Sequence, residues 1–181
     1  MKILFCGGKM LIDYTEEYDA VWDKVNRMLR FNPSCGNRGH LMTGNLPFGI
    51  DLPYSVYAIE YMTNKQLDLM DELVRNCLIM CTNGSKEWYA LDWQHSAFKF
   101  KPQDIEEQQS FWVEDERFIG GGYNAYFPPF YPDGDYYFFI DEDFENGYLG
   151  HPWRREVWIF GVRLQEEIKK IYQKLGWKII Y

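Results

Sequence analysis

Three segments of the chain repeat apolar residues at intervals of three and four, which is the spacing of an amphipathic helix. They are residues 13–31 (DYTEEYDAVWDKVNRMLRF), 63–84 (TNKQLDLMDELVRNCLIMCTNG) and 162–176 (VRLQEEIKKIYQKLG). Asp13 with Glu16, and Thr63 with Gln66, each have the spacing of a capping box, which predicts where the first two helices begin. Gly176 is a C-cap candidate for the third helix. The pattern therefore predicts three amphipathic helices.

Strands are predicted where β-branched and aromatic residues alternate with polar ones or form short apolar runs. These segments are 54–61 (YSVYAIEY), 87–94 (EWYALDWQ), 97–101 (AFKFK), 135–140 (DYYFFI) and 155–161 (REVWIFG). The run 135–140 is continuously apolar after its first residue, so we expect a central strand covered on both faces, with 155–161 as its neighbour. The second and third segments are separated near His95 and Ser96.

Three stretches carry no clear period and are interpreted as irregular. Residues 102–110 are polar and predict a solvated loop, and residues 111–130 contain three consecutive glycines and a Pro-Pro pair. Residues 33–53 form a loop longer than most connections, of the kind that covers a surface or lines a site, and the sequence does not distinguish these roles.

The order of these elements favours an α+β fold with a mainly antiparallel sheet packed by about three helices. At 181 residues, the chain has the size of one domain and can bury roughly 70% of its extended surface. We expect one domain over residues 1–181, with a core at 13–172 and an N-terminal extension at 1–12.

The charge balance limits the classes of partner. There are 19 basic and 27 acidic residues, and the formal net charge is -8 at pH 7. This works against a nonspecific hold on nucleic acid or on an anionic membrane, and it suits a basic protein partner. The opening MKILFCGGKM has too short an apolar run for a signal segment or a membrane span, so we expect a cytoplasmic protein.

No metal or other cofactor is predicted from the cysteines. Cys77 and Cys81 fall on the apolar side of a helix, where reduced thiols pack as small hydrophobic groups. Cys35 and His40 lack two further ligands for zinc.

Residues 131–153 (YPDGDYYFFIDEDFENGYLGHPW) combine acidic, aromatic and glycine residues without lysine or arginine. The acids after the strand resemble a calcium loop, but the glycine and glutamate that an EF-hand requires are absent, since Asn146 and Pro152 stand in those places. We interpret the segment as a turn, a central strand and a second turn, with an acidic rim exposed for function.

A hydrolase reading of the same region uses His151 as acid and base. Asp135 or Asp143 would orient it or act as the second carboxylate, and Arg154 would hold an anionic substrate. The alternative is that His151 and the arginines serve packing and pairing. Asp92, His95 and Ser96 are adjacent in sequence, which is no evidence for a catalytic triad, and no nucleophile elbow accompanies them.

The segments FNPS, YALDWQH and YPDGDYYFFIDEDFENGYLGHPW, followed by FG and a helix, together resemble a bacterial family known only as a domain of unknown function. The resemblance covers roughly residues 13–172. It implies a small bacterial protein and transfers no catalytic residue.

The leading hypothesis is an acidic protein-binding module of the immunity or antitoxin type, which docks onto a basic partner. Its candidate contact residues are Asp133, Asp141, Asp143, Glu145, Tyr148 and Trp153. The alternatives are the hydrolase described above and a small-molecule binding protein lined by aromatic residues. The sequence leaves the oligomeric state open.

Overall fold

The computed structural model describes residues 4–6, 8–33, 48–105 and 110–181. Among these residues, one sheet has the strand order β1-β2-β5-β4-β8-β9-β10-β3-β11, and each pairing is antiparallel. Its strands are β1 (Leu4–Cys6), β2 (Lys9–Leu11), β3 (Tyr54–Ala58), β4 (Trp88–Asp92), β5 (Ala97–Phe100), β8 (Tyr137–Asp141), β9 (Gly147–His151), β10 (Glu156–Phe160) and β11 (Lys178–Ile179). The predicted α+β class, with a single domain and a mainly antiparallel sheet, is confirmed.

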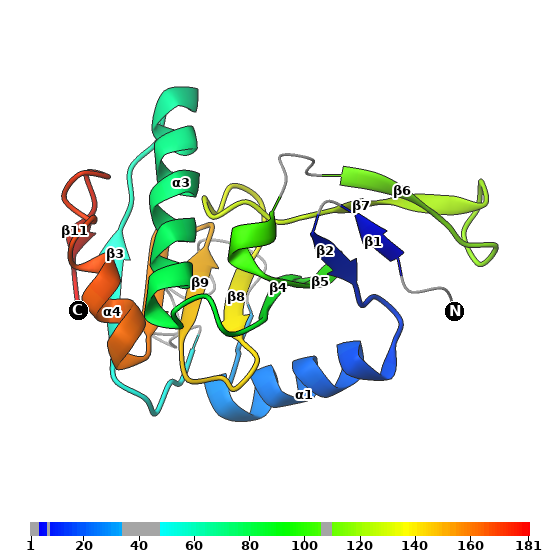
Figure 1. The fold of residues 1–181 in the computed structure, drawn as a ribbon, viewed down its shortest axis with the longest axis horizontal. Coiled ribbons are helices and arrows are strands. Elements are labelled where there is room, and N and C mark those ends of the chain that lie inside the picture. Colours follow the sequence, from blue (N-terminus) through cyan, green and yellow to red (C-terminus); the bar gives the residue numbers. More distant parts are fainter. Residues whose placement is uncertain (1–3, 7, 34–47, 106–109) are drawn as a thin grey trace.

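Helices cover both faces of this sheet (Figure 1). They are α1 (Glu16–Leu29), α3 (Asn64–Cys81) and α4 (Val162–Ile168). The side chains of β8 alternate between two cores. Phe138 and Ile140 pack in the core that contains the apolar residues of α1, whereas Tyr137 and Phe139 pack in the core that contains those of α3 and α4. The prediction of a central strand covered on both faces is therefore confirmed.

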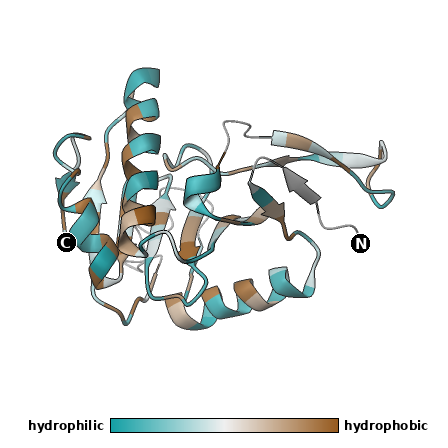
Figure 2. Ribbon diagram, viewed as in Figure 1, coloured by the Kyte–Doolittle hydropathy of each residue, from teal (hydrophilic) through white to brown (hydrophobic). Residues whose placement is uncertain are grey.

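The amphipathic helices begin at polar caps. Figure 2 shows hydrophobic and hydrophilic residues interleaved along α1 and α3. At α3, the Gln66 side-chain oxygen accepts the Thr63 backbone N–H, as the predicted capping box requires. At α1, the predicted cap at Asp13 is wrong, because the Thr15 hydroxyl accepts the Tyr18 N–H instead. Asp13 lies before the helix and is buried.

The prediction of irregular structure for residues 111–130 is wrong. β6 (Ser110–Glu114) and β7 (Gly122–Tyr126) form an antiparallel hairpin that extends away from the main sheet (Figure 1). Gly120 and Gly121 stand near its tip with positive φ angles of 96° and 79°, which glycine adopts without steric cost. Upstream, η1 (Pro102–Asp104) is a short 3₁₀ turn in the predicted solvated loop, whose residues 106–109 lie outside the described part of the chain.

The second predicted turn of the 131–153 segment contains a further strand, β9, which pairs with β8 and with β10. The expectation that 155–161 is the direct neighbour of the 135–140 strand is wrong for this reason. Two glycines make β9 possible, because the ring of Phe160 lies over Gly147 and Pro132 lies over Gly150. Glycine has low β-propensity, so a strand that contains two glycines is not predicted from the residue pattern.

The chain ends extend the sheet at its edges. β2 pairs with β5, and β11 pairs with β3. The third predicted helix is shorter than expected, since α4 ends at Ile168 and turns continue to Gly176, which has a φ of 69°. None of the helices in the described part of the chain has the length and apolarity that a membrane span needs.

Candidate functional site

The acidic loop after β8 is held together by Asp141, which the sequence suggested as an exposed contact residue. Its side chain is fully buried. The carboxylate accepts the backbone N–H groups of Glu145 (2.8 Å) and Asn146 (3.3 Å) and the side-chain amide of Asn146 (2.8 Å). Exposure of Asp141 to a partner is therefore excluded by burial, and its role is to shape the loop.

The exposed acids of this loop are paired with a lysine. Lys86 Nζ lies 2.8 Å from Asp143 and 2.7 Å from Glu145. Both side chains are more than half exposed. The rim is therefore open to solvent, but Lys86 offsets part of its negative charge.

The remaining predicted contact residues differ in exposure. Tyr148 is fully buried in the core, and its hydroxyl donates to the Phe130 carbonyl, so it cannot contact a partner. Asp133 is exposed and accepts a hydrogen bond from the Tyr137 hydroxyl. Trp153 is half-buried and packs edge-on against Tyr136.

The groups of the hydrolase hypothesis lie in different places. His151 is 1% exposed; its Nε2 is 3.4 Å from the Tyr136 hydroxyl, and its Nδ1 accepts the Arg154 backbone N–H at 3.4 Å. The Arg154 side chain is paired with Glu156 at 2.9 Å. β9 runs antiparallel to β8, so His151 lies beside the start of β8, whereas Asp143 follows its end, roughly 13 Å further along the strand.

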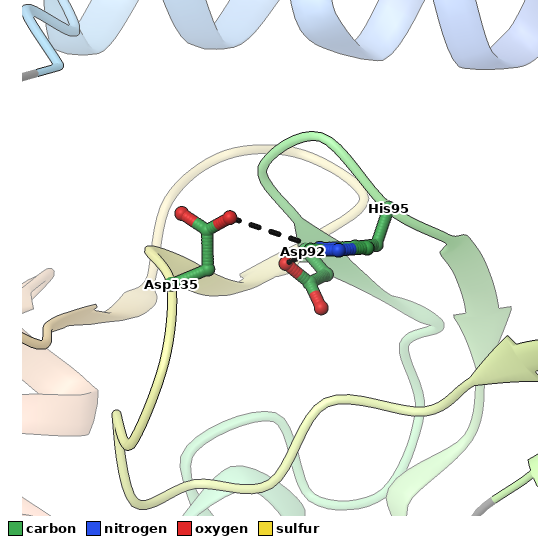
Figure 3. A group of neighbouring side chains, drawn as sticks. All are labelled: Asp92, His95 and Asp135. Carbon is green, nitrogen blue, oxygen red and sulfur yellow. Dashed lines mark hydrogen bonds and ion pairs between the residues drawn. The ribbon is translucent and has the colours of Figure 1, made fainter. Parts of the chain in front are cut away.

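The structure instead brings Asp135 to His95 and Asp92 (Figure 3). We call these three residues the Asp–His cluster. His95 Nδ1 is 3.1 Å from Asp92 Oδ1 and 3.7 Å from Asp135 Oδ2. The tight turn after β4 makes this possible, because Gln94 has a φ of 87° and the His95 N–H donates to the Asp92 carbonyl. Asp135 comes from the turn that precedes β8.

Burial dominates the electrostatics of the cluster. Asp92 and Asp135 are only 7% and 8% exposed, whereas the His95 side chain is 59% exposed. Burial raises the pKa of Asp92 to about 6, and it also raises the pKa of Asp135, since both lose hydration of the charged form. In the sequence, Asp92 and His95 stand close to Ser96, and the three have the residue types of a catalytic triad. That triad is absent, because Ser96 is buried and hydrogen-bonded to Asp13.

A concave surface of about 750 Å³ lies between the β6–β7 hairpin and the turn before α1. We call it the hairpin cleft. Its acidic lining residues are Asp13, Glu114, Asp115 and Glu116. Arg117 is the basic residue among the lining residues, and its guanidinium is paired with Asp115 and stacked 4.4 Å from the centre of the Tyr14 ring.

The aromatic lining of the hairpin cleft comes from both sides. Tyr14 and Trp112 are about half exposed, at 53% and 52%. Tyr123 donates its hydroxyl proton to Asp13, which also accepts the Ala97 N–H. The sequence pattern does not predict this site, because it favours irregular structure for the residues that form the hairpin. The available signal is the aromatic content of the two strands, with Phe111 and Trp112 in β6 and Tyr123 and Tyr126 in β7.

Comparison with known proteins identifies a family and a relative that the chain resembles. The family described as Protein of unknown function (DUF2716) matches residues 14–165. The uncharacterized protein YxiI of Bacillus subtilis (strain 168) is 29% identical over 153 residues, covering 83% of this chain and 86% of the relative. No solved structure matches the chain significantly. The expected likeness to a bacterial family of unknown function is confirmed.

Proposed function

The chain belongs to the family of proteins of unknown function DUF2716, and from that premise we propose that it is an acidic protein-binding module of the immunity or antitoxin type. In this proposal it acts in the cytoplasm by docking onto a basic partner protein through the hairpin cleft. The observation that carries the proposal is the lining of the cleft, in which the exposed carboxylates of Glu114 and Glu116 stand with aromatic rings and the basic lining residue, Arg117, is already paired with Asp115.

Charge complementarity supports a basic occupant. The one guanidinium is already engaged by Asp115, whereas Glu114 and Glu116 are exposed and have no ion pair within 4 Å among the described residues. The protein as a whole carries a net charge of -8, so its long-range field also attracts a basic partner. A lysine or arginine entering the cleft would gain carboxylate partners without displacing an internal one.

The arrangement of Arg117 supports the same occupant. Its guanidinium makes the two contacts that recognition of a basic side chain uses, a carboxylate fork at Asp115 and an aromatic face at Tyr14. Trp112 supplies a second, half-exposed aromatic surface in the cleft. Tryptophan and tyrosine are the residues that most often anchor interfaces, since they bury a large area at little entropic cost.

The test begins with capture of the partner from a native bacterial lysate at low salt, followed by kinetics with the isolated pair. The variant Glu114→Lys/Glu116→Lys should reduce the association rate constant at least tenfold, and the difference should shrink as salt is added. The matched control is Asp143→Lys/Glu145→Lys, which reverses two exposed charges on the loop after β8.

Three outcomes decide the matter. Slower association of a basic partner with the cleft variant alone supports the proposal. An equal effect of the control variant moves docking to the loop after β8 and contradicts the assignment to the cleft. Unchanged kinetics for both variants contradicts electrostatic docking altogether.

Native mass spectrometry of the purified protein tests the small-molecule alternative. In that case a retained cationic metabolite would be lost in the Glu114→Lys/Glu116→Lys variant.

A further inference from the structure

We propose that the Asp–His cluster binds a divalent transition-metal ion through Nδ1 of His95 and one carboxylate oxygen from each of Asp92 and Asp135. This inference is independent of the docking proposal, because the cluster lies outside the set of residues that line the hairpin cleft. The sequence predicted no metal, since the third donor is far from the other two along the chain. The fold brings Asp135 next to Asp92 and His95.

The three donor atoms already lie at the separations of ligands around one ion. All lie within 4.8 Å of one another, and His95 Nδ1 is 3.1 Å and 3.7 Å from the two carboxylates (Figure 3). Metal–ligand bonds of about 2.0–2.1 Å in a tetrahedral site place neighbouring donors roughly 3.3 Å apart. The two distances from His95 Nδ1 lie on either side of that value, so small side-chain adjustments of His95 and of both carboxylates would bring the donors to that geometry.

The hydrogen bonding of the cluster leaves acceptors open toward its centre. Asp135 Oδ1 accepts the Tyr136 N–H, whereas its Oδ2 has no hydrogen-bond donor within the described residues and is directed at His95. Asp92 Oδ1 is next to His95, and its Oδ2 has no donor in the same part of the chain. Both side chains are mostly buried, and a cation at the centre of the cluster would use these open lone pairs in place of water.

The negative charge of the two carboxylates also favours binding of a cation. Across the described ranges, neither Asp92 nor Asp135 has a lysine or arginine within 4 Å, and the one partner of each is the mostly exposed His95. Asp133 adds a further negative charge that acts on Asp92. Elsewhere in the molecule, buried Asp141 is matched by Lys86 and several hydrogen bonds. The Asp–His cluster has no such compensation.

The donor types indicate the class of ion. Imidazole suits zinc, iron, nickel and copper, whereas carboxylate oxygens suit manganese and magnesium, so a mixed set of one nitrogen and two oxygens favours the transition metals over calcium. Three protein ligands leave at least one position for water or for a ligand group. Metal binding at Nδ1 requires the proton of the neutral ring to be on Nε2, and the His95 side chain is 59% exposed, so water can accept a hydrogen bond from it.

The experiment uses the full chain after chelator treatment, with Zn²⁺ and Mn²⁺ as separate probes. Isothermal titration should give one ion per chain, and Mn²⁺ should lose its free-ion electron paramagnetic resonance signal in the same ratio. Saturation at a hundredfold excess over Kd should raise the melting temperature by about 5 °C. His95→Ala and Asp135→Asn should each weaken binding at least tenfold.

The variants separate a real site from background. His95 is exposed in a turn, so His95→Ala is expected to fold, and Asp135→Asn keeps the shape and the Tyr136 hydrogen bond. The matched control, Asp143→Asn/Glu145→Gln, removes two exposed acids elsewhere and should leave affinity unchanged. The proposal is overturned by the absence of stoichiometric binding of either ion. It is equally overturned by binding that persists in both cluster variants, as a thiol site for Zn²⁺ would produce.

Discussion

The interior of the acidic loop after β8 depends on one carboxylate. Asp141→Ala should lower the free energy of unfolding by about 3 kcal/mol, because two backbone N–H groups and a buried amide lose a charged acceptor. Urea denaturation measures the change. Glu145→Gln, four residues away and exposed, should leave the free energy of unfolding unchanged within error. A similar small effect of Asp141→Ala would show that the loop is held by other contacts.

Asp71 on α3 provides a residue-level test of pH dependence. Burial raises its pKa to about 6 from the usual 3.8, Phe130 opposes the rise through a backbone hydrogen bond, and Asp68 adds to it. The folded state therefore binds the proton more tightly than the unfolded state. The sign follows from linkage: the contribution of Asp71 is favourable at low pH and is lost as the pH rises through the window from about 4 to 6.

Asp71→Asn removes this titration. We compare the unfolding free energy of the variant with that of the parent at each pH. This difference should favour the variant by about 1 kcal/mol more at pH 7.5 than at pH 5. Urea denaturation at the two pH values measures the difference, and Asp68→Asn, an exposed neighbour on the same helix, should show no such dependence. A gap between Asp71→Asn and the parent that is equal at both pH values would contradict the raised pKa.

At the scale of elements, β9 is the clearest test of packing. A methyl group at Gly147 would lie 2.1 Å from the Phe160 ring, and both residues are buried between paired strands. Gly147→Ala should therefore destabilise the protein by about 2–3 kcal/mol, the cost of overpacking. Thermal denaturation checks the value against Gly134→Ala, where a methyl group meets ordinary contact distances. Equal stability of the two variants would mean that β9 can shift away from β10.

The elements that could be predicted from sequence share a strong local signal. α1 and α3 have long apolar periods, and β8 is a continuous apolar run, so each was found from its own residues. β9 could not be found this way. Its glycines are required because Phe160 and Pro132, which belong to other elements, occupy the space of a side chain at Gly147 and Gly150. The Asp–His cluster was missed for the same reason. Its third member, Asp135, comes from the turn before β8, the strand that pairs with β4.

At the scale of the whole molecule, the two proposed sites are carried by parts of the fold that differ in how many strands they pair with. The Asp–His cluster stands at the ends of β4 and β8, strands in the middle of the sheet with partners on both sides. The hairpin cleft is bounded by β6 and β7, which pair with each other and form a separate two-stranded sheet. A preorganised metal site needs the first kind of support, whereas a docking surface tolerates the second.

Hydrogen exchange should reveal this difference directly. Amides of β8 and β9 should exchange only through global unfolding, since these strands are buried on both faces and paired on both edges. Amides of β6 and β7 should exchange at least a hundredfold faster, because these strands pair with each other and not with the main sheet, although Val113 and Ala125 pack in the core that contains α3. Mass spectrometry of peptides from the two regions measures the ratio. Equal protection would join the hairpin to the main sheet in one cooperative unit, and the cleft would then be as rigid as the Asp–His cluster.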